Sequence, residues 1–386
     1  MKDKKLIRVT TVPVSLLKLL AGQCKFMSDY YNVIGVSSPG PHLDEVNKVE
    51  GIRVVEVPMT RTISPVTDLK SLIKMYQLFK REKPFIVHTH TPKAGVVGMF
   101  AAKLAGVPHR LHTVAGLPLL LVKGRKRKVL DLVEKFTYAC ATKVYPNSSG
   151  LYDIILENNY CEAQKLKVLA NGSSNGIDLN YFDPQHFDEV QKQKLRTGLN
   201  IATTDFVFVF VGRMVGDKGV DLLVKAFEKL QQSYDDVKLL LVGSVEAKMD
   251  PLKAESYQSI ETNKSIITVG NQRDVRPYFA ISDALAFPSF REGFPNVVLQ
   301  AGAMGLPSIV SNINGCNEII VPQKNGVIVP VKSADALFEA MLEFRKDRSA
   351  TQAMAANSRE MIVSRYDRNV VWEAILQEYQ NLENHV

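Results

Sequence analysis

The sequence predicts an α/β protein with two doubly wound domains, each a parallel sheet covered by helices. Its 386 residues suffice for roughly two and a half domains of about 150 residues each. Short apolar runs alternate with longer helical patterns almost from end to end, which is typical of parallel sheets connected through helices. A segment rich in Gly, Ser, Asn, Asp and Pro, residues 171–184, interrupts this alternation and is the predicted linker.

The first predicted domain spans residues 1–180. Its opening residues are interpreted as a first strand and helix and not as a signal peptide, because Arg8, Pro13 and Lys18 interrupt the apolar run. The predicted strands are residues 6–11, 31–36, 53–57, 85–88, 110–113, 143–145 and 166–169. The predicted helices between them are residues 68–80, 94–104, 130–139 and 150–157.

The second predicted domain spans residues 181–368 and begins with a polar helix around residues 191–196. A last helix at residues 369–386 has no strand after it and could cross back onto the first domain, with Trp372, Ile375, Leu376 and Tyr379 at helical spacing. The predicted strands of this domain are residues 206–211, 237–242, 266–269, 284–287, 308–310 and 326–329.

Composition excludes several classes of protein. With 46% hydrophobic and 23% charged residues, the chain is neither disordered nor fibrous, and no apolar run approaches the ~18 residues of a membrane span. Its four cysteines are far apart, so neither a disulfide scaffold nor a zinc site is expected and a reducing, cytoplasmic compartment fits. The net charge of +8 permits phosphates, nucleic acid or anionic lipid as partners without choosing among them.

The most informative loop follows the predicted strand at residues 206–211. It reads GRMVGDKG over residues 212–219 and places Arg213 and Lys218 among glycines at a strand end. Charged donors and exposed backbone N–H groups in this arrangement suit a diphosphate. The alternative is a solvated basic turn in which Gly219 eases entry into the next helix.

A second loop, PSFREGFPN over residues 288–296, is predicted to lead into a helix at residues 297–304. A helix N-terminus presents unpaired N–H groups and a partial positive charge, so it would hold the same anion from the opposite side. Glu292 would then accept hydrogen bonds from sugar hydroxyls beside the phosphate site. The alternative is that Glu292 caps its own helix.

These two loops carry a resemblance. The pair G-R-x4-K-G and REGFPNVVLQAGAMGLP, residues 291–307, resembles the signature of the family 4 retaining glycosyltransferases of the GT-B fold, over essentially the whole chain. The resemblance implies two Rossmann-like domains facing a cleft. It implies metal-independent sugar transfer from a nucleotide diphosphate sugar, expected to be a UDP-sugar, with retention of configuration, no protein nucleophile and no cofactor.

The resemblance also assigns roles. Arg213 and Lys218 would neutralise the diphosphate, and Glu292 would contact the donor sugar. The family's Glu-x7-Glu motif has Gln300 in place of its second acid, which holds the ribose; Gln300 can still bond two hydroxyls but lacks the charge. Pro295 has no N–H to offer the sugar. Further donor contacts are expected from Gly212, Gly293, Phe294, Asn296, Val297 and, near the base unless its loop is an ordinary surface turn, Arg273.

In the first domain the resemblance places a donor-sugar and acceptor-side contact on a His-Thr pair at a strand end. His112 is thereby the fourth expected catalytic residue, and Thr113 an expected donor contact. His90 and Lys93 are expected on the acceptor side. His88 is interpreted as a structural hydrogen-bonding residue, which a lone His at a strand end usually is.

A basic run precedes the predicted helix at residues 130–139. Attraction to anionic lipid is worth about 1 kcal/mol per cation, so the run could hold the protein at the inner face of a membrane; the alternative is a solvated loop. Nucleic acid is not expected as a partner because no aromatic residues interleave the run. The cations of the run are Lys123, Arg125, Lys126, Arg127 and Lys128.

The sequence resembles bacterial enzymes of capsular and surface-polysaccharide assembly, and this resemblance implies transfer of a hexosyl or N-acetylhexosaminyl group to a glycan or polyprenyl-diphosphate-linked acceptor. Two alternatives remain at this point. A non-hydrolysing UDP-sugar 2-epimerase would share the fold and the diphosphate site. A catalytically silent sugar-nucleotide-binding protein would follow if the change to Gln300 were disabling.

Overall fold

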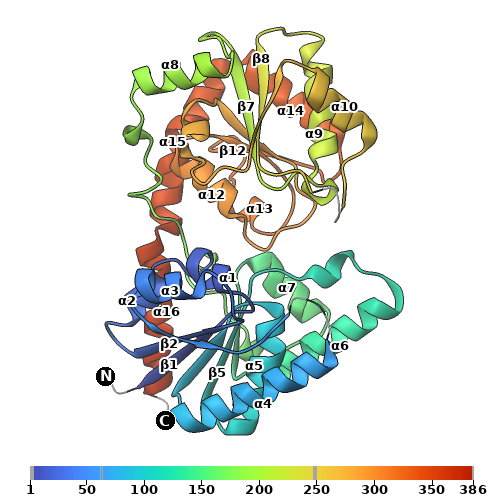
Figure 1. Ribbon diagram of the computed structural model, residues 1–386. Coiled ribbons are helices and arrows are strands. Elements are labelled where there is room, and N and C mark those ends of the chain that lie inside the picture. The colour runs from blue at the N-terminus through green and yellow to red at the C-terminus, as the bar shows by residue number, and fades with distance from the viewer. Residues whose placement is uncertain (1–3, 61, 63, 247–249, 385–386) are drawn as a thin grey trace. The chain divides into compact units, whose positions relative to one another are not determined.

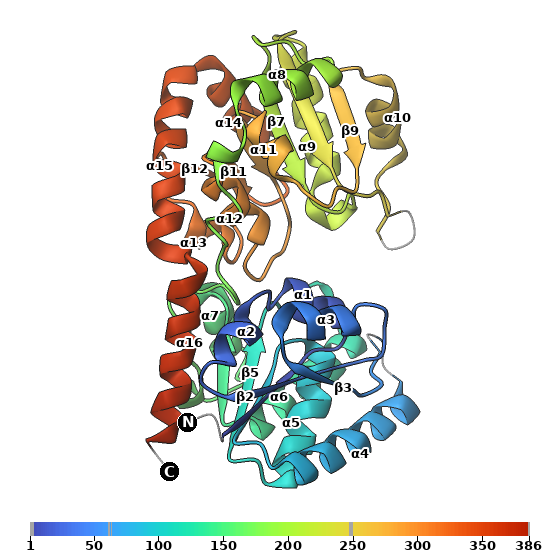
Figure 2. The same ribbon diagram turned by 60° about the vertical axis from the view of Figure 1, so that its left-hand side comes forward.

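The computed structural model describes residues 4–60, 62, 64–246 and 250–384. The chain divides into two compact units, unit 1 with residues Met1–Gly176 and Arg368–Val386, and unit 2 with Ile177–Asp367. Each unit holds a six-stranded parallel sheet with helices on both faces (Figures 1 and 2), so the predicted doubly wound α/β class is confirmed. The segment predicted as a linker contains the division between the units and no strand or α-helix.

The sheet of unit 1 has the order β3-β2-β1-β4-β5-β6, in which β1 pairs in parallel with both β2 and β4. All carboxyl ends of its strands therefore lie at one edge, where ligands of doubly wound sheets bind. The strands are β1 (Lys5–Val9), β2 (Asn32–Ser37), β3 (Arg53–Glu56), β4 (Ile86–Thr89), β5 (His109–Val114) and β6 (Lys143–Pro146).

Alternation along β1 builds two cores. Leu6 packs into one cluster with residues of α1, α3 and α16, whereas Ile7 packs into another with residues of α4, α5 and α6. Helices therefore form a layer on each face of the sheet (Figure 1). They are α1 (Pro13–Lys18), α2 (Gln23–Met27), α3 (Leu43–Glu50), α4 (Pro65–Glu82), α5 (Pro92–Ala105), α6 (Gly124–Cys140), α7 (Ser149–Glu157) and α16 (Arg368–Glu383), with 3-10 turns at Pro118–Leu121 and Ala163–Lys165.

The C-terminal helix α16 packs on unit 1. Its buried face contributes Ile375, Leu376 and Tyr379 to the cluster that holds Leu6, and its Trp372 Nε1 donates to Asn175 Oδ1 at 2.6 Å. Burial of this apolar stripe attaches the last helix of the chain to the first sheet.

The sheet of unit 2 has the order β12-β11-β10-β7-β8-β9. Its central strand β7, FVFVFV, is buried on both faces, as expected for a parallel strand between two helical layers. The strands are β7 (Phe206–Val211), β8 (Val237–Val242), β9 (Ile266–Gly270), β10 (Ala284–Phe287), β11 (Ser308–Ser311) and β12 (Gly326–Val329). The α-helices are α8 (Glu189–Gly198), α9 (Val220–Gln231), α10 (Ala254–Thr262), α11 (Arg276–Ala280), α12 (Asn296–Ala303), α13 (Cys316–Ile319), α14 (Ala334–Lys346) and α15 (Arg348–Tyr366), with 3-10 turns at Pro184–His186 and Gly216–Lys218.

Two predicted elements differ from the structure. The run at residues 166–169 is no strand, because only Leu166 forms an isolated bridge, to Val144. Leu166 and Leu169 are instead buried in the two opposite cores of unit 1, which explains the apolar run without a ladder. The basic run does not precede its helix but supplies the first turns of α6, which begins at Gly124.

Candidate active site

The two loops that the sequence singles out in unit 2 lie against each other at the carboxyl edge of its sheet. The loop after β7 and the loop after β10 are joined by Phe290 N donating to Asp217 O at 2.9 Å and by an Arg291–Asp217 ion pair at 2.8 Å. Gly219 has a φ of 72°, and a Cβ there would lie 2.1 Å from Pro288 O, so no larger residue fits between the loops.

Lys218 and Glu292 meet at this junction. The Lys218 ammonium donates to Glu292 Oε1, and the Ser289 hydroxyl donates to the same oxygen at 3.0 Å. Both charged side chains are more than four-fifths buried, with 16% and 18% exposed. A cation and a carboxylate are thus held side by side at a strand-end edge, where one can contact phosphate oxygens and the other sugar hydroxyls.

Arg213 has a different partner. Its Nη1 lies 3.0 Å from Glu246 Oε2, on the segment after β8, and the guanidinium side chain is 43% exposed. Arg213, Lys218 and Arg291 each therefore have a carboxylate partner. A bound diphosphate would have to compete with, or be shared among, these ion pairs.

The helix after the second loop, α12, starts at Asn296 with Pro295 at its N-cap position and no side-chain cap. Glu292 does not cap this helix, since its carboxylate faces Lys218 and Ser289. Gly315, with a φ of 73°, lets the loop after β11 pack there, because a Cβ would lie 2.8 Å from Gly293 O and Phe294 Cα.

The remaining predicted donor contacts of unit 2 lie around this helix start and beyond it. Gly293 and Phe294 are buried, and the Phe294 ring packs on Tyr366 with centroids 5.4 Å apart. Arg273 is exposed on the loop after β9, where its neighbour Asp274 pairs with Arg276 at 2.7 Å. On the loop after β7 and along α12, Gly212, Val297 and Gln300 are half-buried and Asn296 is exposed.

In unit 1, His112 and Thr113 point to opposite faces of β5. His112 is 3% exposed, its Nδ1 lies 2.7 Å from Thr89 Oγ1, and its Cε1 lies 2.5 Å from where a Cβ on Gly95 of α5 would be. Thr113 instead hydrogen-bonds His88 Nε2 at 2.8 Å. The His112 ring is therefore enclosed between sheet and helix, away from the face to which Thr113 points.

A buried polar cluster lies on the Thr113 face. His88 Nδ1 lies 2.6 Å from the Tyr379 hydroxyl and 3.3 Å from Arg8 Nη1, in agreement with the structural interpretation of His88. The His90 ring packs on His88 with centroids 4.1 Å apart, and both its nitrogens lack a partner among the described residues. Burial, reinforced by the Arg8 charge, holds the pKa values of His88 and His90 well below 6.5.

Lys93, expected on the acceptor side, pairs with Asp68 of α4 at 2.6 Å. Arg127 of the basic run is also engaged, since its Nε pairs with Asp131 at 2.6 Å and its Nη2 donates to the Tyr160 hydroxyl at 3.0 Å. The other four cations of the run, Lys123, Arg125, Lys126 and Lys128, are exposed.

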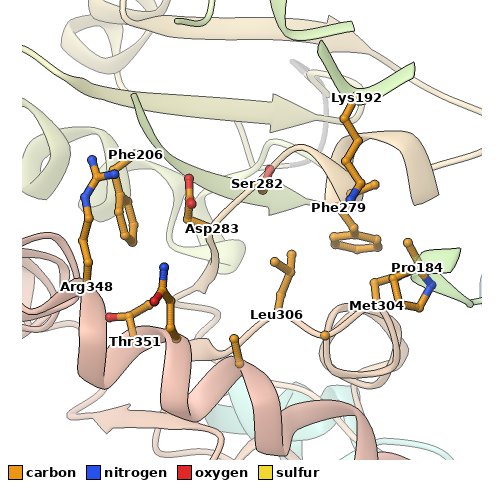
Figure 3. Close-up of a pocket in the computed structure, with 14 residues that line it drawn as sticks. Pro184, Lys192, Phe206, Phe279, Ser282, Asp283, Met304, Leu306, Arg348 and Thr351 are labelled. Atoms are coloured by element: carbon orange, nitrogen blue, oxygen red, sulfur yellow. The ribbon is translucent and has the colours of Figure 1, made fainter. Parts of the chain in front are cut away.

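A well-defined pocket of unit 2 lies elsewhere. Figure 3 shows it between α15 and the start of β7, with Phe206, Asp283 and Leu306 at the amino ends of their strands. Its volume is about 260 Å³. Because ligands of doubly wound sheets bind at the carboxyl ends, this pocket is not the site that the loops form. Among residues 4–60, 62, 64–246 and 250–384, no group of three or more His, Cys, Asp or Glu side chains could hold a metal ion.

Comparison with known proteins agrees with this geometry. The chain matches the families described as "Glycosyl transferases group 1" over residues 191–361 and "Glycosyl transferase 4-like domain" over residues 32–172. CapM of Staphylococcus aureus, a capsular polysaccharide biosynthesis glycosyltransferase, is 34% identical over 378 residues, covering 97% of this chain and 96% of the relative. The chain therefore belongs to the same glycosyltransferase family as CapM.

This glycosyltransferase is also similar to a second enzyme in sequence and to a solved structure in fold. An Escherichia coli enzyme named UDP-Gal:alpha-D-GlcNAc-diphosphoundecaprenol alpha-1,3-galactosyltransferase is 32% identical, covering 85% of this chain and 83% of the relative. The crystal structure of Anabaena HepE in complex with UDP has a TM-score of 0.81 at 20% identity, covering 98% of this chain and all of HepE. The second similarity shows the GT-B fold.

Sequence reasoning missed three polar residues at the glycosyltransferase site. Ser289 and Asp217 lie inside the two loops that the sequence singles out. Only Ser289 is close in sequence to its partner, Glu292, and that closeness was a signal for it. Glu246 comes from the segment after β8, which carries no motif, so only the fold places it beside Arg213.

Acid is expected to destabilise unit 1 through its buried imidazoles. Burial lowers the pKa of His112 from 6.5 to about 4, so the unfolded chain binds a proton that the folded chain does not. The lowered pKa of His112 contributes on the order of 3 kcal/mol to the free energy of unfolding above pH 6.5. This contribution is lost as the pH falls from 6.5 toward 4. Thermal melting between about pH 7.5 and pH 4.5 should therefore fall less for His112→Asn than for the wild type. An equally steep fall in both proteins would contradict this assignment.

Proposed function

We propose that this glycosyltransferase transfers a hexosyl or N-acetylhexosaminyl group from a UDP-sugar to a polyprenyl-diphosphate-linked glycan. The reaction retains the anomeric configuration, requires no metal ion, and takes place at the inner face of a membrane, where such acceptors are anchored. The observation that carries the proposal is the Lys218–Glu292 pair, fixed by Ser289 at the carboxyl edge of the unit 2 sheet.

The proposed chemistry needs little from the protein beyond electrostatics. The acceptor hydroxyl attacks the anomeric carbon from the face that the diphosphate leaves. The bond between that carbon and the diphosphate oxygen breaks, the new glycosidic bond forms, and the hydroxyl proton passes to the leaving phosphate oxygen. Lys218 and Arg213 neutralise the charge that grows on the diphosphate, and preorganised contacts of this kind are typically worth several kcal/mol.

The carboxylate partners have a role in this scheme. Glu292 accepts hydrogen bonds from donor-sugar hydroxyls while it stays beside Lys218. Donor binding therefore adds contacts to the Lys218–Glu292 ion pair without breaking it. Glu246 competes with the diphosphate for Arg213, which is more exposed and free to turn. The enclosed His112 ring is a neutral imidazole in this scheme. It positions the end of β5 through its hydrogen bond with Thr89.

The choice of substrates is supported by the relatives. The E. coli relative is named for a UDP-sugar donor and a diphosphoundecaprenol-linked acceptor, and the S. aureus relative for capsular polysaccharide biosynthesis. Membership of this family favours transfer over the epimerase and the silent binding protein as alternatives.

A direct assay tests the proposal. The protein is incubated with UDP-sugars, a synthetic polyprenyl-diphosphate-linked acceptor sugar and a chelator, and the product's anomeric configuration is read by NMR. Transfer with retention supports the proposal. An epimerised nucleotide sugar formed without acceptor, or donor binding without transfer, would overturn it. A prior thermal-shift screen of UDP and GDP selects the nucleotide, since a ligand at 100 times its Kd stabilises the folded chain by about 2.7 kcal/mol.

Gln300→Glu is expected to retain activity within about threefold. Either side chain accepts hydrogen bonds from ribose hydroxyls, so the change adds a charge without removing an acceptor. The side chain lies on α12, which begins at Asn296 after the loop that holds Glu292, and is half-buried. Steady-state transfer with the same UDP-sugar checks this expectation, and complete loss of activity would show that Gln300 has another role.

A further inference from the structure

Helix α4 exposes an apolar stripe to solvent. Val66, Leu69 and Ile73 are between 48% and 68% exposed and are spaced so that they share one face of the helix. The opposite face of the same helix is buried through Met75, Leu78 and Phe79 in the core of unit 1. The helix therefore has two apolar faces, of which only one is covered within the described chain.

Helix α6 repeats this arrangement. Val129, Leu132 and Phe136 have the same spacing and are between 43% and 67% exposed. Thr137 and Tyr138, which directly follow Phe136, point to another face of the helix and are buried. Isolated exposed apolar residues are ordinary, but two stripes with matching spacing on two helices of one unit need an explanation.

Both stripes lie in one layer of unit 1. Helix α5 contacts both α4 and α6, and these three helices pack on the same face of the sheet (Figure 1). The Phe100 ring of α5 meets the Phe136 ring of α6 with centroids 5.1 Å apart, which joins the α6 stripe to the middle helix. We call the outer surface of α4 and α6, with these six apolar residues, the docking face.

The charges around the docking face are almost all positive. Three of the four carboxylates of the two helices form ion pairs: Asp68 with Lys93, Glu82 with Lys5, Arg53 and Arg81, and Asp131 with Arg127. Burial raises the pKa of the fourth, Glu134. The cations, by contrast, face solvent. The exposed ones are Lys70, Lys74, Lys80 and Arg81 on α4, and Arg125, Lys126, Lys128 and Lys135 on α6.

We infer that the docking face lies flat on a lipid bilayer rich in anionic headgroups. Exposed apolar stripes flanked by lysine and arginine are what amphipathic helices present at a membrane interface, with the apolar residues at the acyl boundary and the cations at the headgroups. Each cation near an anionic surface raises the binding constant about fivefold. The inference rests on the proposed function in one respect: a lipid-linked acceptor gives the enzyme a reason to stay at a bilayer.

Vesicle flotation tests the docking face. Full-length protein is mixed with vesicles of phosphatidylcholine alone or with an equal amount of phosphatidylglycerol. We expect binding to the anionic vesicles only, reduced at least tenfold by the double variant Leu69→Asp/Leu132→Asp. Replacing Lys126 and Lys128 by Gln should reduce it about 25-fold. The matched control is Val190→Asp on α8 of unit 2, which is 78% exposed and should bind like the wild type.

Several outcomes would show that the docking face does not bind lipid. Wild-type protein that ignores anionic vesicles, or stripe variants that bind as well as the wild type, would overturn the inference. If light scattering shows a dimer that the double variant abolishes, the face binds a second copy and not lipid. Thermal stabilisation by UDP is measured on every variant. If wild-type UDP binding and transfer fail while vesicle binding persists, the proposed function fails and the docking face stands.

Discussion

Lys218→Ala is expected to lower kcat/KM for sugar transfer by about 10²–10³-fold, the usual cost of removing one preorganised group that stabilises charge in a transition state. The Lys218 ammonium lies at the carboxyl edge of the unit 2 sheet, mostly buried and held by Glu292. An enclosed cation stabilises a departing diphosphate far more than one in water, because the local dielectric is low. The loss should appear in kcat as well as KM, since the charge on the diphosphate grows in the transition state.

The variant also leaves the Glu292 carboxylate without its cation, so a loss of folding has to be separated from a loss of catalysis. The double variant Lys218→Ala/Glu292→Gln removes both charges and should melt closer to the wild type while remaining inactive. Lys229→Ala is the matched control, because Lys229 pairs with Asp335 on an exposed surface at 3.1 Å and such pairs contribute at most about 1 kcal/mol. Lys218→Ala activity within about twofold of the wild type would mean that this cation does not face the donor.

The meeting of the two loops could be predicted from sequence because parallel strands end at a common edge. Once β7 and β10 are recognised as strands of one parallel sheet, the loops after them must start from the same side. That geometry brings Lys218 and Glu292, which carry opposite charges, to the same edge of the sheet. Which cation pairs with which acid does not follow. Arg213 selects Glu246 because β8 is the other neighbour of β7, and the sequence alone does not give the strand order.

The orientation of His112 shows a different limit. Alternation along a strand predicts that His112 and Thr113 point to opposite faces, but not which of them faces the helices. The small Gly95 on α5 decides the matter by leaving space for the imidazole. The family resemblance assigns a contact to His112 and Thr113 together. Because adjacent residues of a strand point to opposite faces, only one of these two side chains can lie on the face where that contact is made.

The basic run illustrates a limit of local composition. The run of five cations is predicted to precede the helix at residues 130–139, and cations in a first helical turn are unfavourable to the helix dipole. The helix begins at Gly124 all the same, because Arg127 is fixed by its i,i+4 pair with Asp131 and by donating to Leu119 O at 3.2 Å. These contacts depend on the turn at Pro118–Leu121, which no periodic pattern in the sequence predicts.

Glu292→Gln is expected to separate sugar recognition from diphosphate binding. Hydrogen bonds to a charged group contribute about 1.5–3 kcal/mol, so loss of the carboxylate charge should lower kcat/KM for transfer about 10–100-fold. The affinity for UDP, which carries ribose but lacks the donor sugar, should stay about the same, because Lys218 keeps its ammonium for the diphosphate. Titration calorimetry with UDP and kinetics with the UDP-sugar measure the two effects on one protein. Glu189→Gln is the matched control, because the Glu189 side chain is 88% exposed and pairs with Lys192. If UDP affinity falls as steeply as transfer does, Glu292 holds the two loops together and does not contact the sugar.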